Sequence, residues 1–421
     1  MSPTEATTAT PTPWWIRFLT RHLARLEVGA ITVTDPLGRS WTWPQGAMPT
    51  GEWQIRRPAR ALARLVRGDL GFAEGYAAGD WDSPDLVALL ATLARLREPG
   101  SRTTALAAPF RLSGRLRHAW HRNSRRGSRR NVIAHYDLGN DFYAAWLDAT
   151  MTYSCAHFAR PDEPLARAQR RKHDRVLERL EARPGARVLE IGSGFGGFAL
   201  RAAARGLRVE ALTLSPAQLS YAQARARREG YGEDRVRFRL CDYRDVPVPP
   251  RYDHVVSIEM FEAVGEAYWT RFFRLVADAL TPEGRGALQI IVIDPARFAA
   301  YRRRPDFIQR HIFPGGMLPT LPILHELARG VGLDLVATTH HGADYARTLA
   351  RWLARFDAAW PGLAREKSER FRRLWRYYLA YCIAGFRTGR IDVILATVRH
   401  RTPRPRQPER GRTPYTGRTL P

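Results

Sequence analysis

Apolar and polar positions alternate in blocks through the C-terminal two thirds of the chain. Apolar runs of the length and composition typical of buried parallel strands are separated by helix-like segments. These strands are predicted at 187–191, 208–214, 236–240, 252–258 and 287–293. A further strand, predicted at 391–398 after two helical stretches, would close an edge of the sheet. The alternation predicts an α/β fold with a doubly wound, mostly parallel sheet, whose ligand lies beyond the carboxyl ends of the strands.

The first hundred residues have a different pattern. Short strand-like and helix-like pieces occur there without repeats or clustered catalytic residue types, at 30–34, 39–43, 57–66 and 83–96. They predict a smaller α+β accessory domain over 14–110, followed by a catalytic domain over 131–400. Residues 1–13 and 401–421 are rich in Pro together with Thr and Ala or with Gly and Arg. Such ends cannot bury a core, so both are predicted to be disordered.

The chain is strongly basic, because 67 Lys and Arg residues against 41 Asp and Glu residues give a net charge of +26. Residues 111–130 hold a run of arginines beside Trp120 without any acid. We interpret this segment as a basic linker that is either solvated or bound to an anionic partner. A membrane surface fits that partner as well as nucleic acid does, since each basic side chain near an anionic bilayer contributes about 1 kcal/mol.

Hydropathy and cysteine content narrow the class of protein. No run approaches the roughly 18 apolar residues that a membrane-spanning helix needs, and the N-terminus lacks a signal-peptide pattern. A soluble, cytoplasmic protein is therefore expected. The three cysteines, Cys155, Cys241 and Cys382, are too few and too scattered for a disulfide framework or a zinc cluster. No metal is expected.

A glycine-rich turn follows the strand predicted at 187–191. Gly192, Gly194 and Gly197 let the backbone turn sharply and approach a ligand, and they also fit the G-x-G-x-x-G pattern of a dinucleotide site. Glu190 stands inside the apolar strand, where a carboxylate is costly unless a charged or hydrogen-bonding group meets it. The amino group of a methionine moiety would meet it. The turn therefore favours S-adenosylmethionine over a dinucleotide.

The next two strands bear on the same choice. The second strand ends without an acid at its tip for a ribose, although Glu210 lies near enough to keep a dinucleotide open. Asp242 follows the third strand, where it is placed to accept from an adenine amino group. Ser215 and Pro216 begin a helix, so Gln218 is a helix cap, a cofactor contact, or both.

Several segments go beyond a generic methyltransferase. They are 135–143 (HYDLGNDFY), 151–155 (MTYSC), 259–265 (EMFEAVG), 312–319 (IFPGGMLP), 342–345 (GADY) and 377–382 (YYLAYC). Their joint order, over 131–398, closely resembles the bacterial cyclopropane-fatty-acyl-phospholipid synthase family, whose catalytic domain has a class I methyltransferase-like fold. The N-terminal region is similar to that family's lipid-engaging domain in size and placement alone.

The resemblance implies an S-adenosylmethionine-dependent enzyme that adds a one-carbon unit to the double bond of unsaturated acyl chains in membrane phospholipids. The carbocation formed would lose a proton to a bound bicarbonate and close to a cyclopropane. Because an alkene is a poor nucleophile, such a site must exclude water and hold both partners in contact. The implied partner is unsaturated phospholipid at the cytoplasmic face of the inner membrane, with no nucleic acid. The oligomeric state stays open, a homodimer included.

By matched motif, the resemblance implies that Cys155, Glu262 and Tyr345 hold the bicarbonate, with Glu262 the principal catalytic residue. His135 and Cys382 are further catalytic candidates, although an inert core thiol is the favoured interpretation of Cys382. The implied cofactor contacts, beside Glu190 and Asp242, are Tyr153, Ser154, Gly192, Gly194, Thr213 and Gln218.

One position departs from the family. A histidine on its fifth strand is replaced here by Gln289, with Ile291 retained two residues later. Glutamine can hydrogen-bond bicarbonate but cannot titrate. The base is then held differently, or the product is a methyl- or methylene-branched chain, or the protein is a non-catalytic lipid-binding homologue.

Aromatic residues supply further candidates. Rings that would stabilise a cation by about 0.5 to 2 kcal/mol each, or else pack in the core, are Tyr136, Phe142, Tyr143 and Phe261. A nucleic-acid methyltransferase is a rival reading of the arginine excess. It is disfavoured because residues 257–261 read SIEMF, where base-methylating enzymes commonly have Asn or Asp followed by two prolines and an aromatic residue.

Overall fold

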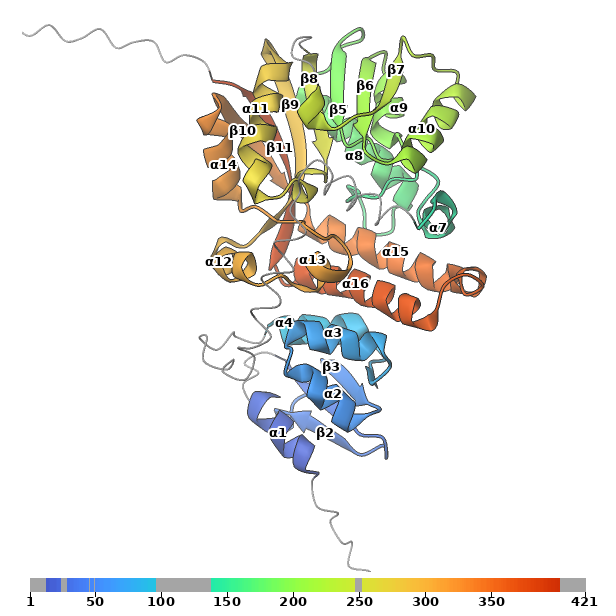
Figure 1. Ribbon diagram of the computed structural model, residues 1–421, viewed down its shortest axis with the longest axis vertical. Coiled ribbons are helices and arrows are strands. Elements are labelled where there is room, and N and C mark those ends of the chain that lie inside the picture. Colours follow the sequence, from blue (N-terminus) through green and yellow to red (C-terminus); the bar gives the residue numbers. More distant parts are fainter. Residues whose placement is uncertain are drawn as a thin grey trace, which may run out of the picture.

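The computed structural model describes most of the chain as two packed units (Figure 1). The described residues are 13–23, 29–44, 46–48, 50–95, 138–246 and 252–401. The predicted basic linker at 111–130 and nearly all of the two predicted tails lie outside these ranges. Their roles stay predictions.

The N-terminal unit is a four-stranded sheet with helices packed on it, in the strand order β2-β1-β3-β4. Its elements are α1 (Trp14–Leu23), β1 (Ile31–Thr34), β2 (Ser40–Trp43), β3 (Gly51–Ile55), α2 (Pro58–Leu65), α3 (Asp69–Ala77), β4 (Trp81–Asp82) and α4 (Leu86–Ala94). In β3, Gly51, Trp53 and Ile55 are buried and the residues between them are not, which is the period of two of a half-buried strand. The unit is α+β, as predicted.

The larger unit contains a seven-stranded sheet in the order β10-β11-β9-β8-β5-β6-β7 (Figure 1). Its strands are β5 (Arg187–Ile191), β6 (Arg208–Thr213), β7 (Val236–Leu240), β8 (Tyr252–Ile258), β9 (Leu280–Ile293), β10 (Leu333–His340) and β11 (Ile391–His400). Strands β5 to β9 run parallel, and β11 and β10 join them antiparallel. The strand order reverses at β5, where doubly wound sheets bind their ligands. The predicted fold class is confirmed.

The prediction that the strand at 391–398 closes the sheet edge is wrong. β11 lies between β9 and β10, and β10 is the edge strand. Within β10 only the first residue, Leu333, is buried, so the strand carries no sustained apolar run that a hydropathy pattern would detect. Edge strands in contact with solvent need few apolar residues.

Helices cover both faces of this sheet. On one face α8 (Leu165–Leu180), α9 (Gly197–Ala203) and α10 (Pro216–Arg228) enclose one apolar cluster. On the other, α11 (Trp269–Ala279) and α14 (Leu321–Gly330) enclose a second. Shorter helices are α7 (Asn140–Trp146), α12 (Pro295–Arg303) and α13 (Phe307–His311).

Two long helices, α15 (Gly342–Leu363) and α16 (Glu369–Arg387), lie between the seven-stranded sheet and the N-terminal unit (Figure 1). Arg373 of α16 fastens the N-terminal unit to this helix pair. Its guanidinium donates to the carbonyl oxygens of Tyr76 and Trp81 at 2.5 and 2.8 Å, and pairs with Asp82 at 3.1 Å. The helix pair α15 and α16 therefore contacts both the N-terminal unit and the candidate active site.

The described part of the chain lacks two kinds of feature. None of its helices is long and apolar enough to span a membrane. The same residues contain no group of three or more His, Cys, Asp or Glu side chains suited to a metal ion.

Candidate active site

The glycine-rich turn lies at the carboxyl end of β5, at the point where the strand order reverses. Gly192, Gly194 and Gly196 have φ angles of +91°, +51° and +82°, which residues with a side chain rarely adopt. A Cβ atom on Gly192 would lie 2.8 Å from Met260 Cγ. These positions therefore require glycine, which is typical of a turn that approaches a ligand closely.

Glu190 is the buried acid of this turn. Within the described ranges its Oε2 atom has no hydrogen-bond partner. Burial raises the pKa of its carboxyl to about 8, and the nearby Lys172 ammonium opposes the rise. Lys172, itself buried on α8, donates to Ser154 Oγ at 2.5 Å. A buried carboxyl oxygen without a partner fits the amino group of a methionine moiety, whose positive charge would favour the ionised form of Glu190, so these residues fit S-adenosylmethionine.

The predicted contacts at the end of β6 form one hydrogen-bonded group. Thr213 Oγ1 donates to Gln218 Oε1 at 2.9 Å, and Ser215 caps α10 by accepting from the Gln218 amide at 3.2 Å. All three residues are buried. Gln218 is therefore both part of the helix start and held beside the strand edge, and its contact with the cofactor stays a prediction.

The two acids that bore on the cofactor choice are both paired. Glu210 is the third residue of β6, set back from the carboxyl end, and it accepts from Arg239 and from Tyr252 Oη. Glu210 therefore does not support a dinucleotide site. Asp242 accepts from the guanidinium of Arg244 through both carboxylate oxygens, at 2.8 and 2.5 Å. Its contact with adenine stays a prediction.

A second group of polar side chains meets at Glu259, which sequence reasoning missed. Its Oε1 accepts from the Cys155 amide at 2.8 Å and from Gln289 Nε2 at 2.7 Å. Its Oε2 accepts from Tyr345 Oη at 2.5 Å. The structure therefore brings three of the predicted catalytic residues together around a carboxylate that was assigned no role. We call these four residues the Glu259 cluster.

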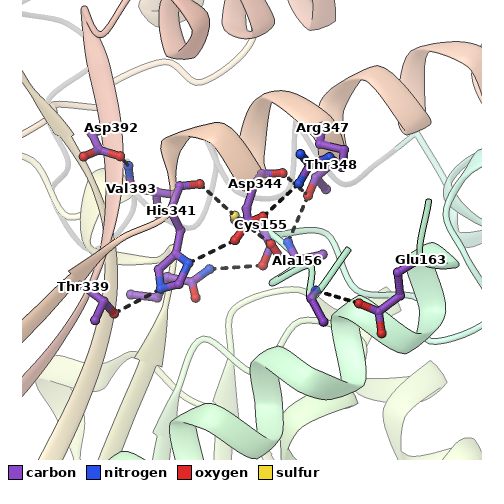
Figure 2. A network of polar contacts seen from close by, with 12 residues as sticks. Cys155, Ala156, Glu163, Thr339, His341, Asp344, Arg347, Thr348, Asp392 and Val393 are labelled. Atoms are coloured by element: carbon purple, nitrogen blue, oxygen red, sulfur yellow. Dashed lines mark hydrogen bonds and ion pairs between the residues drawn. The ribbon is translucent and has the colours of Figure 1, made fainter. Parts of the chain in front are cut away.

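The backbone at Cys155 is held from several sides (Figure 2). The Cys155 thiol donates to the carbonyl oxygens of Ala156 and His341 at 3.2 and 3.7 Å. The next amide, of Ala156, donates to Thr348 Oγ1 of α15 at 3.1 Å (Figure 2). These contacts fix the loop before α8 against the start of α15, so the Cys155 amide is aimed at Glu259.

Electrostatics explain the state of each member of the cluster. Burial raises the pKa of the Glu259 carboxyl, while the Tyr345 hydroxyl, the Lys172 ammonium and the Cys155 amide oppose the rise. Burial, and then the charge of Glu259, raise the pKa of the Tyr345 phenol well above its usual value, so it stays a donor. The same two causes raise the pKa of the Cys155 thiol. Cys155 therefore contributes its backbone amide and no thiolate.

Glu262 lies one helical turn beyond Glu259, in the short 3-10 helix η3 (Phe261–Ala263). Its Oε1 accepts from the Ile291 amide at 2.5 Å, and its Oε2 is buried without a hydrogen-bond partner among the described residues. Burial, and then the neighbouring Glu259, raise the pKa of Glu262 to about 8. Glu262 is therefore mostly protonated at neutral pH.

The donors that the resemblance assigns to bicarbonate are already used. The Cys155 amide and the Tyr345 hydroxyl, with Gln289 in place of the family's histidine, bind the Glu259 carboxylate. A bicarbonate on the same donors would need the position that this carboxylate occupies. The residues present therefore do not fit that ion as long as these donors bind Glu259.

The structure says less about the roles of the two remaining catalytic candidates and of one predicted cofactor contact. His135 lies outside the described residues. Cys382 lies on α16, where burial raises the pKa of its thiol and so disfavours the thiolate that a nucleophile needs. Tyr153, a predicted cofactor contact, shares a hydrogen bond of 2.8 Å with Tyr378 of α16. Tyr153 thus links the loop before α8 to the helix pair.

The aromatic candidates lie in packed clusters of rings. Phe142 meets Trp375 edge to face with centroids 5.0 Å apart, and Phe261 meets Phe272 in the same way at 5.1 Å. Tyr143 is fully buried as well. This geometry agrees with core packing, and stabilisation of a cation by these rings stays a prediction. Tyr136 lies outside the described ranges.

Two features of the sequence could have identified Glu259. It directly follows the buried strand β8, beside the point where the strand order reverses, and ligands bind at that edge. It is also a second acid three residues before Glu262. Of these two acids, the resemblance implied a role for Glu262 alone.

Known proteins resemble this chain over most of its length. Residues 123–395 match the family model described as mycolic acid cyclopropane synthetase. A tuberculostearic acid methyltransferase of Mycobacterium tuberculosis (strain ATCC 25618 / H37Rv) is 43% identical over 350 residues, covering 80% of this chain and 81% of that protein. The cyclopropane-fatty-acyl-phospholipid synthase of Escherichia coli (strain K12) is 33% identical over 369 residues, covering 85% and 90%.

Solved structures agree with the sequence relatives. A cyclopropane synthase from Mycobacterium tuberculosis superposes with a TM-score of 0.60 at 33% identity, over 64% of this chain and 97% of that one. A mycolic acid cyclopropane synthase crystallised with SAH and CTAB superposes with a TM-score of 0.59 at 32% identity, again over 64% and 97%.

Proposed function

Since the chain belongs to the mycolic acid cyclopropane synthetase family of S-adenosylmethionine-dependent methyltransferases, we propose that it transfers a methyl group to the double bond of an unsaturated phospholipid acyl chain. The observation that carries this proposal is the Glu259 cluster, a carboxyl group held by three buried donors and followed by Met260, which lies against Gly192 of the glycine-rich turn. An anion fixed in a dry site stabilises the positive charge that forms on the alkene.

The chain's own residues bind and orient the two reactants. When bound, S-adenosylmethionine supplies an electrophilic methyl group. Glu190 would hold its amino group, and the positive φ angles of Gly192 and Gly194 let the backbone turn sharply beside it. Tyr153 and Tyr378, whose hydroxyls bond each other, present ring carbon toward neighbouring apolar residues and help exclude water.

Membrane phospholipid is the proposed source of the acyl chain. Large apolar side chains of the described N-terminal unit are exposed at Trp14, Leu37 and Met48, by 66%, 77% and 86%. They lie in a chain of net charge +26, which favours an anionic surface. We therefore propose peripheral contact with the cytoplasmic membrane face, and no nucleic acid partner.

Two products can follow from the same cation. Loss of a proton from the transferred methyl with closure onto the cationic carbon gives a cyclopropane, the first candidate. If a hydride shifts first, the same proton loss gives a methylene branch. Two observations favour this second candidate: the relative at 43% identity is named a methyltransferase, and Gln289 replaces the family's histidine.

A direct assay tests the proposal. The full chain is incubated with methyl-deuterated S-adenosylmethionine and anionic vesicles whose phospholipids carry oleoyl chains, and the released fatty acids are analysed by mass spectrometry. Vesicles with saturated chains are the matched control. We expect deuterium in the oleoyl-derived acids alone. Proton NMR of the unlabelled product then separates ring methylene protons, which resonate far upfield, from vinylidene protons.

The proposal has a clear failing result. A chain that binds S-adenosylmethionine, measured by calorimetry, but adds no carbon to any vesicle lipid is the non-catalytic lipid-binding homologue instead.

A further inference from the structure

Three donors from three separate elements converge on the Glu259 carboxylate. The Cys155 amide comes from the loop before α8, Gln289 from β9 and Tyr345 from α15, and the distances to Glu259 are 2.5 to 2.8 Å. The side chains of Gln289 and Tyr345 and the whole of Cys155 are buried, so water competes little for these bonds. Donors arranged in this way make an anion site. The anion in this site is a side chain of the protein, the Glu259 carboxylate.

We propose that Glu259 is the base of the reaction and that its carboxylate takes the place of a free bicarbonate. This inference rests on the proposed function, the methylation of an alkene. A carboxylate and a bicarbonate share a planar O–C–O group and a single negative charge. The same donors therefore satisfy either ion, and the one already attached to the chain needs no binding step.

The hydrogen bonds leave Glu259 able to accept a proton. A carboxylate has about four lone-pair sites, two on each oxygen. Oε1 uses two, on the Cys155 amide and on Gln289, and Oε2 uses one, on Tyr345. Among the described residues, Oε2 therefore keeps one site. Glu259 is also partly exposed, unlike the donors around it.

The proton transfer balances in atoms and charge. The acyl chain carries the new methyl group next to a cationic carbon. Glu259 Oε2 takes a proton from that methyl, and the electron pair of the broken C–H bond becomes the ring bond, or a C=C bond if a hydride has shifted first. The cation and the carboxylate both become neutral, and the proton later leaves to solvent.

The replacement of histidine by Gln289 follows from the same arrangement. A glutamine amide donates a hydrogen bond at every pH, so it holds a fixed carboxylate without titrating beside it. Burial raises the pKa of Glu259, which makes it a stronger base, while the Lys172 ammonium opposes that rise.

Variants at Glu259 separate the two possible bases. Glu259→Gln keeps the shape of the side chain and removes the base. Glu259→Gly removes the carboxylate, leaves the three donors for an external anion, and suits a backbone φ of +51° that favours glycine. Glu283→Gln, at an exposed position early in β9, is the matched control.

The first readout is binding and does not depend on activity. [13C]Bicarbonate is titrated into each protein and followed by NMR linewidth, with thermal unfolding and S-adenosylmethionine affinity recorded as checks on folding. We expect saturable binding to Glu259→Gly and none to the wild type or to Glu283→Gln. Saturable binding to the wild type that Tyr345→Phe weakens would overturn the inference, whether or not the lipid assay succeeds.

The second readout is transfer to oleoyl vesicles in buffer freed of carbon dioxide. We expect the wild type to keep its rate, and both Glu259 variants to lose at least about 100-fold, the usual contribution of a general base. Added bicarbonate should restore Glu259→Gly and leave Glu259→Gln inactive. A wild-type rate that collapses without bicarbonate, or a Glu259→Gln rate within threefold of the wild type, would refute the role of Glu259. A wild type that modifies no lipid would refute the proposed function instead, and the bicarbonate titration would still decide this inference.

Discussion

Replacing Arg373 by methionine should loosen the N-terminal unit from α16. The guanidinium donates to two carbonyl oxygens, of Tyr76 and Trp81, and its carbon Cζ lies 4.1 Å from the centre of the Tyr76 ring. A buried carbonyl left without a partner costs about 1 to 3 kcal/mol, and the cation–π contact contributes about 0.5 to 2 kcal/mol. Asp82 keeps a second ion pair, to Arg56 at 2.8 Å, and water will reach part of the gap. We therefore expect a loss of about 2 to 4 kcal/mol.

Urea unfolding of the full chain, followed by tryptophan fluorescence and by limited proteolysis, measures this loss. The control is Arg370→Met, because Arg370 lies on the same helix, three residues before Arg373, and is exposed. Substitutions at such surface positions usually change stability by less than about 0.5 kcal/mol. The Arg373 variant should lose stability and expose the N-terminal unit to protease first. Equal unfolding free energies in the two variants would refute the idea that Arg373 fastens the units together.

Three further predictions concern the site. Glu262→Gln should stabilise the protein more at pH 8 than at pH 5: because the folded pKa is raised to about 8, the wild type loses stability as pH rises through the range between the ordinary glutamate value and 8. Unfolding free energies that differ from the wild type equally at both pH values would contradict this. Lys172→Met removes a cation that lowers the pKa of Glu259, so the rising limb of the pH–rate profile should move to higher pH; an unmoved limb would count against it. Gly192→Ala should weaken S-adenosylmethionine binding at least about tenfold in calorimetry, because the new Cβ meets Met260 at a φ of +91°; unchanged affinity would show that the turn does not face the cofactor.

Strands of the parallel part of the sheet were predicted most accurately. The predicted bounds 187–191, 236–240 and 252–258 agree with β5, β7 and β8 residue for residue. β5 and β8 are buried along most of their length, as central parallel strands are, whereas β7, at the sheet edge, alternates buried residues with more exposed ones. β10 was missed because only its first residue is buried, so its sequence shows neither pattern.

The candidate active site was also predicted only in part from the sequence. The resemblance implied that Cys155, Glu262 and Tyr345 act together, with Gln289 at the companion position. Three of these four meet around the Glu259 carboxylate, whereas Glu262 accepts from the Ile291 amide. Their meeting point was not predictable from spacing, because hydrogen bonds to Glu259 depend on how β8, β9 and α15 pack. The pKa of Glu262 is likewise a property of burial in the folded chain.

The left-handed backbone at Glu259 has a genetic consequence. A φ of +51° is comfortable for glycine and tolerable for glutamate when the fold holds it in place. The codons GGA and GAA, which encode these two residues, differ by a single nucleotide. A single nucleotide change would therefore convert an enzyme whose base is the Glu259 side chain into one that needs dissolved bicarbonate as its base. The reverse conversion would also need only one nucleotide change.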